Sequence, residues 1–362
     1  MNKEELRILA DAVHAEGKRL ALYACSHVPA ELLEAAGFAA VRLPQIEDAP
    51  DIAARILPGN LCPLVKECCN TCECAEAAGA DLIIAESSCD GKKKMYELLS
   101  RRERLYYYQV PQGEDRDYVR PLFRSEMGFF RKMLRERFGI EIGQKSLREA
   151  IRLCNAERES MMQLAALQKS VPPAAHGTQL YEVLFASQKI WDREKRIQFI
   201  KEETEHLRKA AGLISPSAKR ILLTGCPLQG VYRKVIEAVE NNGGTVVCLE
   251  NCDFIKTNIR RTDETAEDLT EALADSYQNT ACAIMSPNER RFRLLKSLWR
   301  EYQVDGVVDV LLQACHSYSV EKDKLRRFCA AEDMPYMAME TSDTETDAGQ
   351  LETRIAAFIE ML

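Results

Sequence analysis

The chain has 362 residues, of which 46% are hydrophobic and 29% charged, and its formal net charge is −7. This length and composition are typical of a globular protein with room for two domains. The negative charge argues against nucleic acid or an anionic membrane surface as a partner, and no run of about 18 apolar residues that would span a bilayer is present. In the opening segment MNKEELRILADAVHAEG, charged residues interrupt the apolar ones, which indicates an amphipathic helix rather than a signal peptide. We therefore expect a cytoplasmic protein.

Strand-like and helical runs alternate over the first third of the chain. Buried strands are expected at 19–25, 38–43, 81–87 and 106–110, and helices at 29–37 and 89–100. This alternation predicts a parallel sheet with right-handed crossover connections. The segment 61–74 is dense in cysteine, and we expect it to be poor in helix.

From about Asp117 to Gly212 the pattern changes to long helical runs, interrupted by a loop around Pro172 and Pro173. After a linker at 214–220, the alternation returns, with strands expected at 219–225, 245–251, 281–286, 304–313 and 336–341. The sequence therefore predicts an α/β protein with two similarly built domains. The expected divisions are an N-terminal α/β domain (1–120), a helical section (121–215) and a C-terminal α/β domain (216–362).

Four cysteines follow directly on strand-like runs, namely Cys89, Cys226, Cys252 and Cys315. The carboxyl ends of parallel strands form the edge of the sheet where ligands bind. Thiolates gathered there suit an iron–sulfur cluster or zinc, whereas disulfides are not expected in a reducing cytosol. For any one of these cysteines the alternative is a buried, inert thiol that packs as a small hydrophobic side chain.

A second thiol-rich segment lies between Cys62 and Cys74 and also contains Cys68, Cys69 and Cys72. Cys69 and Cys72 form a C-x-x-C pair, which by itself is a modest signal for zinc or redox chemistry. Spacing alone does not select the metal ligands within this segment. The remaining cysteines are interpreted as structural: Cys25, Cys154, Cys248, Cys282 and Cys329.

His316 directly follows Cys315 and is a candidate to donate a proton or a hydrogen bond beside the metal; the alternative is an ordinary polar histidine at the start of a loop. The sequence has neither a G-x-x-x-x-G-K-[ST] nor a G-x-G-x-x-G motif after a strand. We therefore do not expect ATP or a dinucleotide to bind through those loops. Electrons for any reduction would come from elsewhere.

Several segments resemble the (R)-2-hydroxyacyl-CoA dehydratase and benzoyl-CoA reductase superfamily, and in particular its branch of double-cubane-cluster anaerobic reductases. They are NLCPLVK, ESSCDGKKKMYELL, ILLTGCP, LENC, YQVDGVVDVLLQACHSYSVEK and GQLETRIAAFIEML, within about Tyr23 to Leu362. The resemblance implies two flavodoxin-like parallel-sheet domains with an intervening helical section. It also implies a homodimer and an iron–sulfur cluster between the domains.

The resemblance implies a double-cubane cluster, in which two 4Fe–4S-type units are bridged by sulfide. The ligands implied by the matching motifs are Cys62, Cys74, Cys89, Cys226, Cys252 and Cys315. Within the thiol-rich segment, Cys69 or Cys72 remains an alternative to Cys74. Six ligands in one chain favour the double cubane over the single 4Fe–4S cluster of a dehydratase subunit.

The function implied by the resemblance is an iron–sulfur reductase that acts on small molecules. It would receive low-potential electrons from a separate ATP-hydrolysing activator protein with its own 4Fe–4S cluster. The first alternative is an (R)-2-hydroxyacyl-CoA dehydratase subunit, a lyase, with a single 4Fe–4S cluster. A second alternative is a non-enzymatic scaffold that is stabilised by zinc or stores electrons.

Overall fold

The computed structural model describes residues 1–99, 103–210 and 214–362, and within these ranges it contains two four-stranded parallel sheets. The first has the strand order β2-β1-β3-β4 and the second the order β6-β5-β7-β8, so the two are built alike. This confirms the predicted pair of flavodoxin-like sheets. The strands are β1 (Arg19–Tyr23), β2 (Phe38–Arg42), β3 (Leu82–Glu86), β4 (Leu105–Tyr108), β5 (Lys219–Gly225), β6 (Gly244–Glu250), β7 (Gly306–Leu312) and β8 (Tyr336–Thr341).

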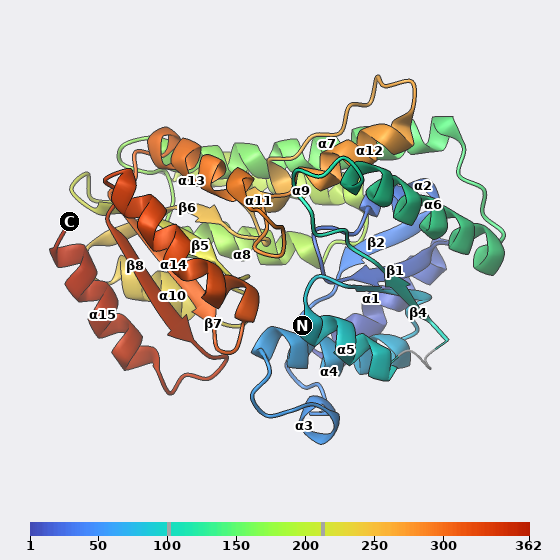
Figure 1. Ribbon diagram of the computed structural model, residues 1–362, viewed down its shortest axis with the longest axis horizontal. Helices are drawn as coiled ribbons and strands as arrows, with labels where there is room; N and C mark the ends of the chain where they lie inside the picture. The colour runs from blue at the N-terminus through green and yellow to red at the C-terminus, as the bar shows by residue number, and fades with distance from the viewer. Residues whose placement is uncertain (100–102, 211–213) are drawn as a thin grey trace.

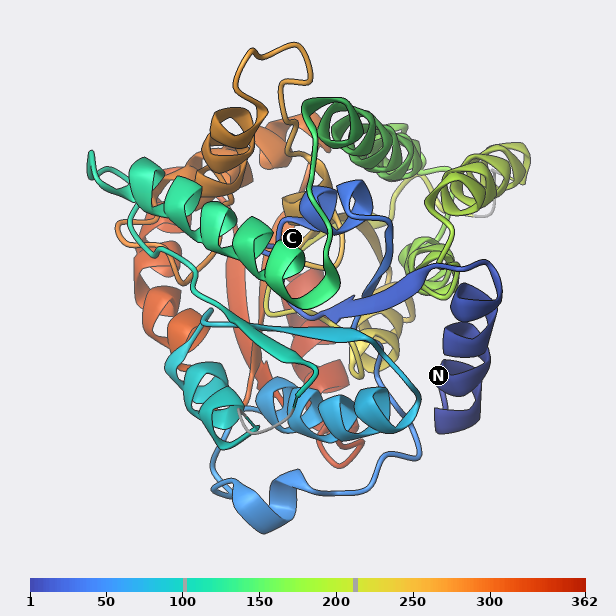
Figure 2. The same cartoon turned by 90° about the vertical axis from the view of Figure 1, so that its right-hand side faces the viewer.

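Helices cover both faces of the first sheet. Leu20 and Leu22 of β1 belong to the core on the side of α4 and α5, whereas Ala21 belongs to the core that includes Phe130 of α6. Successive strand residues point to opposite faces, so this alternation requires a helical layer on each side. Figure 2 shows α4 and α5 on one side of this sheet and α6 on the other. The helices before β4 are α1 (Lys3–Ala15), α2 (Ala30–Ala35), α3 (Ala53–Ile56), α4 (Pro63–Ala77) and α5 (Asp90–Leu99).

The helical section connects the two sheets (Figure 1). Its longest helix, α7, packs against α2 beside the first sheet and against α11 beside the second. The section comprises α6 (Val119–Phe138), α7 (Gln144–Ala166), a short 3₁₀ helix η1 (Leu167–Lys169), α8 (Gly177–Gln188) and α9 (Arg193–Lys209). Among the residues that the structure describes, no helix combines the length and the apolar character needed to cross a membrane.

The remaining helices surround the second sheet at the opposite end of the molecule (Figure 1). They are α10 (Tyr232–Glu240), α11 (Ile255–Asn258), α13 (Glu289–Glu301), α14 (His316–Ala331) and α15 (Ala348–Glu360). The exception is α12 (Leu269–Gln278), which packs against α6 and joins the core of the first sheet. Gly225, at the end of β5, has a φ of 106°, and a Cβ at this position would lie 2.2 Å from the carbonyl oxygen of Val310. Only glycine fits there, which lets β5 end against β7 and places the next residue, Cys226, beside that strand.

The structure corrects the prediction that segment 61–74 is poor in helix, because Pro63–Ala77 is the helix α4. Pro63 occupies the first turn, where a missing N–H costs nothing. Val65, Cys68, Cys69 and Cys72 form its buried side at helical spacing, since a free cysteine packs like a small apolar residue.

The strand predicted at 281–286 is also wrong, since this segment is an irregular turn between α12 and α13 with a single bridge, Gly113 to Ser286. The long helical run predicted after Pro173 is divided into α8 and α9. Asp192 begins the second of them, because its side chain accepts a hydrogen bond from the backbone N–H of Lys195 at 2.9 Å. The helix ends predicted at Ser100 and Gly212 lie outside the described residues.

Candidate metal centre

The carboxyl ends of both sheets border one cavity of about 220 Å³. In each sheet the first strand lies between the second and the third, so the connection after the first strand and the connection after the third run in opposite directions and open a crevice between these two strands. The crevice of the first sheet lies beyond β1 and β3, and that of the second lies beyond β5 and β7. The cavity joins the two crevices and is lined by six cysteines: Cys25, Cys62, Cys89, Cys252, Cys282 and Cys315.

Four of the six predicted ligands, Cys62, Cys89, Cys252 and Cys315, line this cavity. Each lies where a strand gives way to a helix or directly begins one. Cys62 and Cys315 precede the first residues of α4 and α14, respectively, and Cys89 precedes α5. Cys226 is 1% exposed and does not line the cavity, but it is hydrogen-bonded to Cys315. Its sulfur accepts a hydrogen bond from the backbone N–H of Leu312 at 3.3 Å.

The structure does not bring Cys74 to the cavity. It lies twelve residues after Cys62 on α4, a distance of about 18 Å along a helix. The charged groups that act on its thiol include Lys3 and Asp48, neither of which lines the cavity. The alternatives Cys69 and Cys72 are buried in the same helix and do not line the cavity either.

Two cavity cysteines, Cys25 and Cys282, were interpreted from the sequence as structural. Cys25 lies two residues beyond β1, so the rule that selects cysteines after buried strands would have found it. Cys282 carries no such signal, because it lies in the irregular segment between α12 and α13. Contacts with residues far away in the sequence hold this segment at the cavity, namely the bridge from Ser286 to Gly113 and the hydrogen bond from Cys282 to Cys252.

The six thiols divide into two trios. The first trio consists of Cys62, Cys89 and Cys315. Cys62 and Cys315 are hydrogen-bonded to each other, and this bond, more than burial, raises the pKa of Cys62. Burial raises the pKa of Cys89, with Cys62 adding a smaller electrostatic effect. The pKa of Cys315 is raised first by its hydrogen bond with Cys226.

The second trio consists of Cys25, Cys252 and Cys282. Burial raises the pKa of Cys25 to about 12. The thiol of Cys282 donates a hydrogen bond to Cys252 and thereby lowers the pKa of Cys252 to about 6, aided by the positive charges of Lys256 and Arg42. Cys252 is thus the thiol of this trio that ionises most readily. Each trio takes cysteines from both ends of the chain.

The thiols surround a space larger than one ion requires. Within the described ranges, no three His, Cys, Asp or Glu side chains are arranged as ligands of a single metal ion. Sulfur donors suit soft metals and iron–sulfur clusters, and a cluster occupies more room than an ion. The donor set and the size of the cavity therefore fit a polynuclear group.

The turn before α14 positions Cys315 and His316 at the cavity. Ala314 has a φ of 58°, a left-handed conformation that is costly for alanine and turns the chain sharply after β7. The backbone N–H of Cys315 then donates to the carbonyl oxygen of Leu312 at 3.0 Å, and α14 begins. His316 is exposed and lines the cavity, so the structure places this candidate next to the thiols.

A buried ion pair supports the wall of the cavity near Cys89. Lys92, 5% exposed, contacts the fully buried Glu86 with 2.5 Å between Nζ and Oε1. The backbone N–H of Lys92, in the first turn of α5, also points to Cys89 with 3.5 Å between nitrogen and sulfur. The backbone N–H and the positive charge of Lys92 favour negative charge on Cys89, whereas the carboxylate of Glu86 opposes it.

We predict that Lys92→Met destabilises the fold by about 3–5 kcal/mol, because Glu86 would be left as an uncompensated buried carboxylate. Urea unfolding followed by circular dichroism measures this loss. The matched control is Lys94→Met on the same helix, where an exposed pair with Glu97 is screened by water, so its unfolding midpoint should stay close to that of the wild type. Equal midpoints for the two variants would contradict the prediction.

Together, the fold and the cavity define a protein with two flavodoxin-like sheets whose strand ends enclose a set of buried and partly buried thiols. Residues 25–362 match the family model described as 2-hydroxyglutaryl-CoA dehydratase, D-component. The chain therefore belongs to this family, which confirms its resemblance to the dehydratase superfamily.

Two relatives agree with this assignment. Over 345 residues the chain is 40% identical to the "Putative dehydratase subunit YjiM" of Escherichia coli (strain K12), an alignment that covers 93% of this chain and 90% of the relative. Over 346 residues it is 20% identical to the "(R)-phenyllactyl-CoA dehydratase beta subunit" of Clostridium sporogenes, with the same coverage of both chains. Both are described as dehydratase subunits.

Proposed function

We propose that this protein is an iron–sulfur reductase whose cavity holds a double-cubane cluster and which reduces small molecules. The observation that carries the proposal is the arrangement of six cysteines around one cavity in two trios. A 4Fe–4S unit held by three cysteines leaves one iron to be bridged or to meet a ligand. Two trios on one cavity match two such units that share a bridge.

The proposed ligand set differs from the one implied by the sequence motifs in two members. Cys62, Cys89 and Cys315 would hold one unit, and the second trio of Cys25, Cys252 and Cys282 the other. Cys226 would support Cys315 from behind, and Cys74 would have no part in binding.

When bound, such a cluster supplies electrons at low potential and a coordination site for a small substrate. Two of the six proposed ligands, Cys62 and Cys282, are buried, and the other four are partly buried, so the chain would screen such a cluster from water in part. Metal binding requires the thiols to lose their protons, and the raised pKa values of the first trio mean that iron displaces these protons. The imidazole of His316, exposed beside the cavity, is the proposed group to hold a proton near the substrate.

We further propose that electrons arrive from a separate ATP-hydrolysing activator with its own 4Fe–4S cluster, and that the protein acts as a homodimer in the cytoplasm. The sequence motifs support this division of labour, as does the missing phosphate-binding loop. The family model describes a component of an enzyme, which agrees with a partner protein.

The second candidate function is an (R)-2-hydroxyacyl-CoA dehydratase subunit with a single 4Fe–4S cluster. The descriptions of both relatives as dehydratase subunits favour it. The first trio alone would provide the three thiolates for that cluster. The second trio would then be unused, and these additional thiols on the same cavity are our reason for preferring the reductase.

Iron and acid-labile sulfide analysis of protein purified without oxygen tests the proposal. We expect about eight irons per chain for the double cubane, whereas about four would support the dehydratase subunit. EPR spectra of the reduced protein, recorded with and without its activator, provide a second measure. A colourless protein that contains zinc would contradict both functions and support the scaffold.

A further inference from the structure

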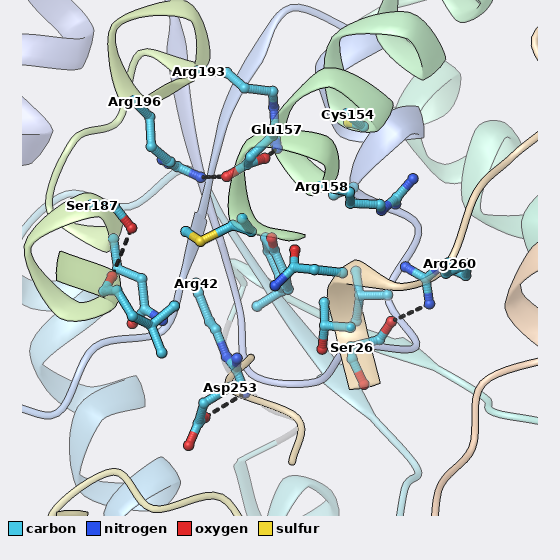
Figure 3. Close-up of a pocket in the computed structure, with 18 of the residues that line it drawn as sticks. Ser26, Arg42, Cys154, Glu157, Arg158, Ser187, Arg193, Arg196, Asp253 and Arg260 are labelled. Atoms are coloured by element: carbon cyan, nitrogen blue, oxygen red, sulfur yellow. Dashed lines mark hydrogen bonds and ion pairs between the residues drawn. The ribbon is translucent and has the colours of Figure 1, made fainter. Parts of the chain in front are cut away.

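A second cavity, of about 90 Å³, lies where the helical section meets both sheets. It shares Ser26 and Arg42 with the cavity that is lined by the six cysteines (the cysteine cavity), so the two cavities are neighbours. Figure 3 shows the side chains that surround it, with Arg193, Arg196 and Glu157 on one side and Arg42 and Asp253 on the other. Its most unusual feature is a set of five arginines: Arg42, Arg158, Arg193, Arg196 and Arg260.

Carboxylates pair with most of these guanidinium groups. Arg193 forms ion pairs with Glu34, at 2.9 Å, and with Glu157. Glu157 also forms an ion pair with Arg196, at 2.8 Å. These bonds connect α9 to α2 and α7, and so they explain part of the cluster as a structural network.

The other two arginines with a carboxylate partner are Arg158, which contacts Glu31, and Arg42, whose Nη2 lies 3.2 Å from Asp253. Among the described residues no carboxylate forms an ion pair with Arg260, which donates hydrogen bonds to the carbonyl oxygen of Ser26 at 3.2 Å and to Oγ1 of Thr280 at 3.0 Å. Four carboxylates thus face five arginines, which leaves one positive charge uncompensated.

Four buried donor atoms at this cavity have no hydrogen-bond partner among the described residues. They are Nη2 of Arg193, Nη2 of Arg196, Nε of Arg260 and Oγ of Ser26. Arg193 and Arg196 are each 5% exposed, so these atoms are not simply solvated at the surface. A buried donor without a partner costs about 1–3 kcal/mol, and such a group in a native protein calls for an unseen partner.

The pKa values of two of these arginines agree with an excess of positive charge at the cavity. Burial, followed by the charge of Arg193, lowers the pKa of Arg196 to about 10, and burial together with Arg158 lowers the pKa of Arg260. Both side chains remain charged at neutral pH. An anion in the cavity would relieve the repulsion between Arg196 and Arg193 and between Arg260 and Arg158.

We infer that this arginine pocket binds a small oxyanion, either a carboxylate or a phosphate group. Guanidinium groups bind both through paired, charge-assisted hydrogen bonds, and the unpaired Nη2 atoms of Arg193 and Arg196 lie one turn apart on α9. A volume of about 90 Å³ has room for several water molecules, hence for an anion of about phosphate size or a short carboxylic acid. The anion would lie next to the cysteine cavity, although its binding does not depend on the cluster.

Isothermal titration calorimetry of the anaerobically purified protein with inorganic phosphate, acetate and succinate tests the inference. We expect saturable binding at one site per chain for at least one probe. Tighter binding of phosphate would identify a phosphate group as the natural ligand, and tighter binding of acetate or succinate a carboxylate. If none of the probes binds saturably, the free donors are merely hydrated and the inference is overturned.

The variant Arg196→Gln should weaken binding about tenfold or more, because it removes a charged donor. Glu157 would keep Arg193 as a partner, so the fold should persist, and a cooperative thermal transition checks this. Arg208→Gln is the matched control, because Arg208 is an exposed arginine on the same helix. Unchanged affinity in Arg196→Gln, or an equal loss in the control, would overturn the inference.

Should Arg196→Gln fail to fold, Arg196→Lys replaces it. Lysine keeps the charge and can still reach Glu157, but it lacks the second arm of the guanidinium fork. Weaker binding in this variant supports the pocket, and unchanged binding overturns it. The iron content of the same samples reports separately on the cysteine cavity, so a failure of the cluster proposal would be recognised as such.

Discussion

Replacing Cys315 with alanine is expected to remove at least half of the iron and to abolish low-potential reductase activity. Cys315 is the only member of the first trio that comes from the C-terminal end of the chain, and it contacts both Cys62 and Cys226. Alanine has no donor atom, so one iron of the unit would lose its protein ligand, and two thiolates would not retain the unit. Iron and sulfide analysis of the anaerobic protein gives the result directly.

Cys154→Ala is the matched control for this prediction. Cys154 is 2% exposed within α7 and does not line the cysteine cavity. Its loss leaves a small void that costs on the order of 1 kcal/mol, and the iron content should remain that of the wild type. A Cys315→Ala protein that kept all of its iron would contradict the first trio, provided that both variants show the far-ultraviolet circular dichroism of the wild type.

Much of the fold could be predicted because its central strands are buried on both faces. The runs LALY, LIIAE, ILLTG and GVVDVLL are too apolar for a half-exposed strand, and all four are strands in the structure. The prediction was wrong where residues are buried outside a strand. In α4 the cysteines are buried as apolar residues of a helix, and at Ala281 and Cys282 an irregular segment is buried by its neighbours.

The site was predictable to the extent that it follows from strand ends. Cys89, Cys226, Cys252 and Cys315 were singled out because each follows a buried strand, and the structure places all but Cys226 on the cavity wall. The sequence did not distinguish Cys62, at the first turn of α4, from the cysteines further along the helix, because buried thiols pack there as apolar side chains. The arginine pocket left no local signal at all, since its charges come from β2, α7, α9 and the segment after α11.

The contrast between Cys282 and Cys74 provides the sharpest test of the revised ligand set. Cys282→Ala is expected to lower the iron content by about half, because it removes one of three thiolates from the second trio and the hydrogen bond that lowers the pKa of Cys252. Cys74→Ala is expected to retain all of the iron. Both thiols are buried to a similar degree, with 6% and 4% exposed, so the two substitutions remove comparable packing.

The opposite result would require a large rearrangement. For Cys74 to bind the same cluster as Cys62, α4 would have to unwind, because about 18 Å of helix separates the two residues. Iron loss in Cys74→Ala with full iron in Cys282→Ala would therefore mean that α4 is not helical in the metal-bound protein. Hydrogen exchange of the backbone amides of α4, compared with and without iron, would detect this directly, because an unwound segment loses its protection.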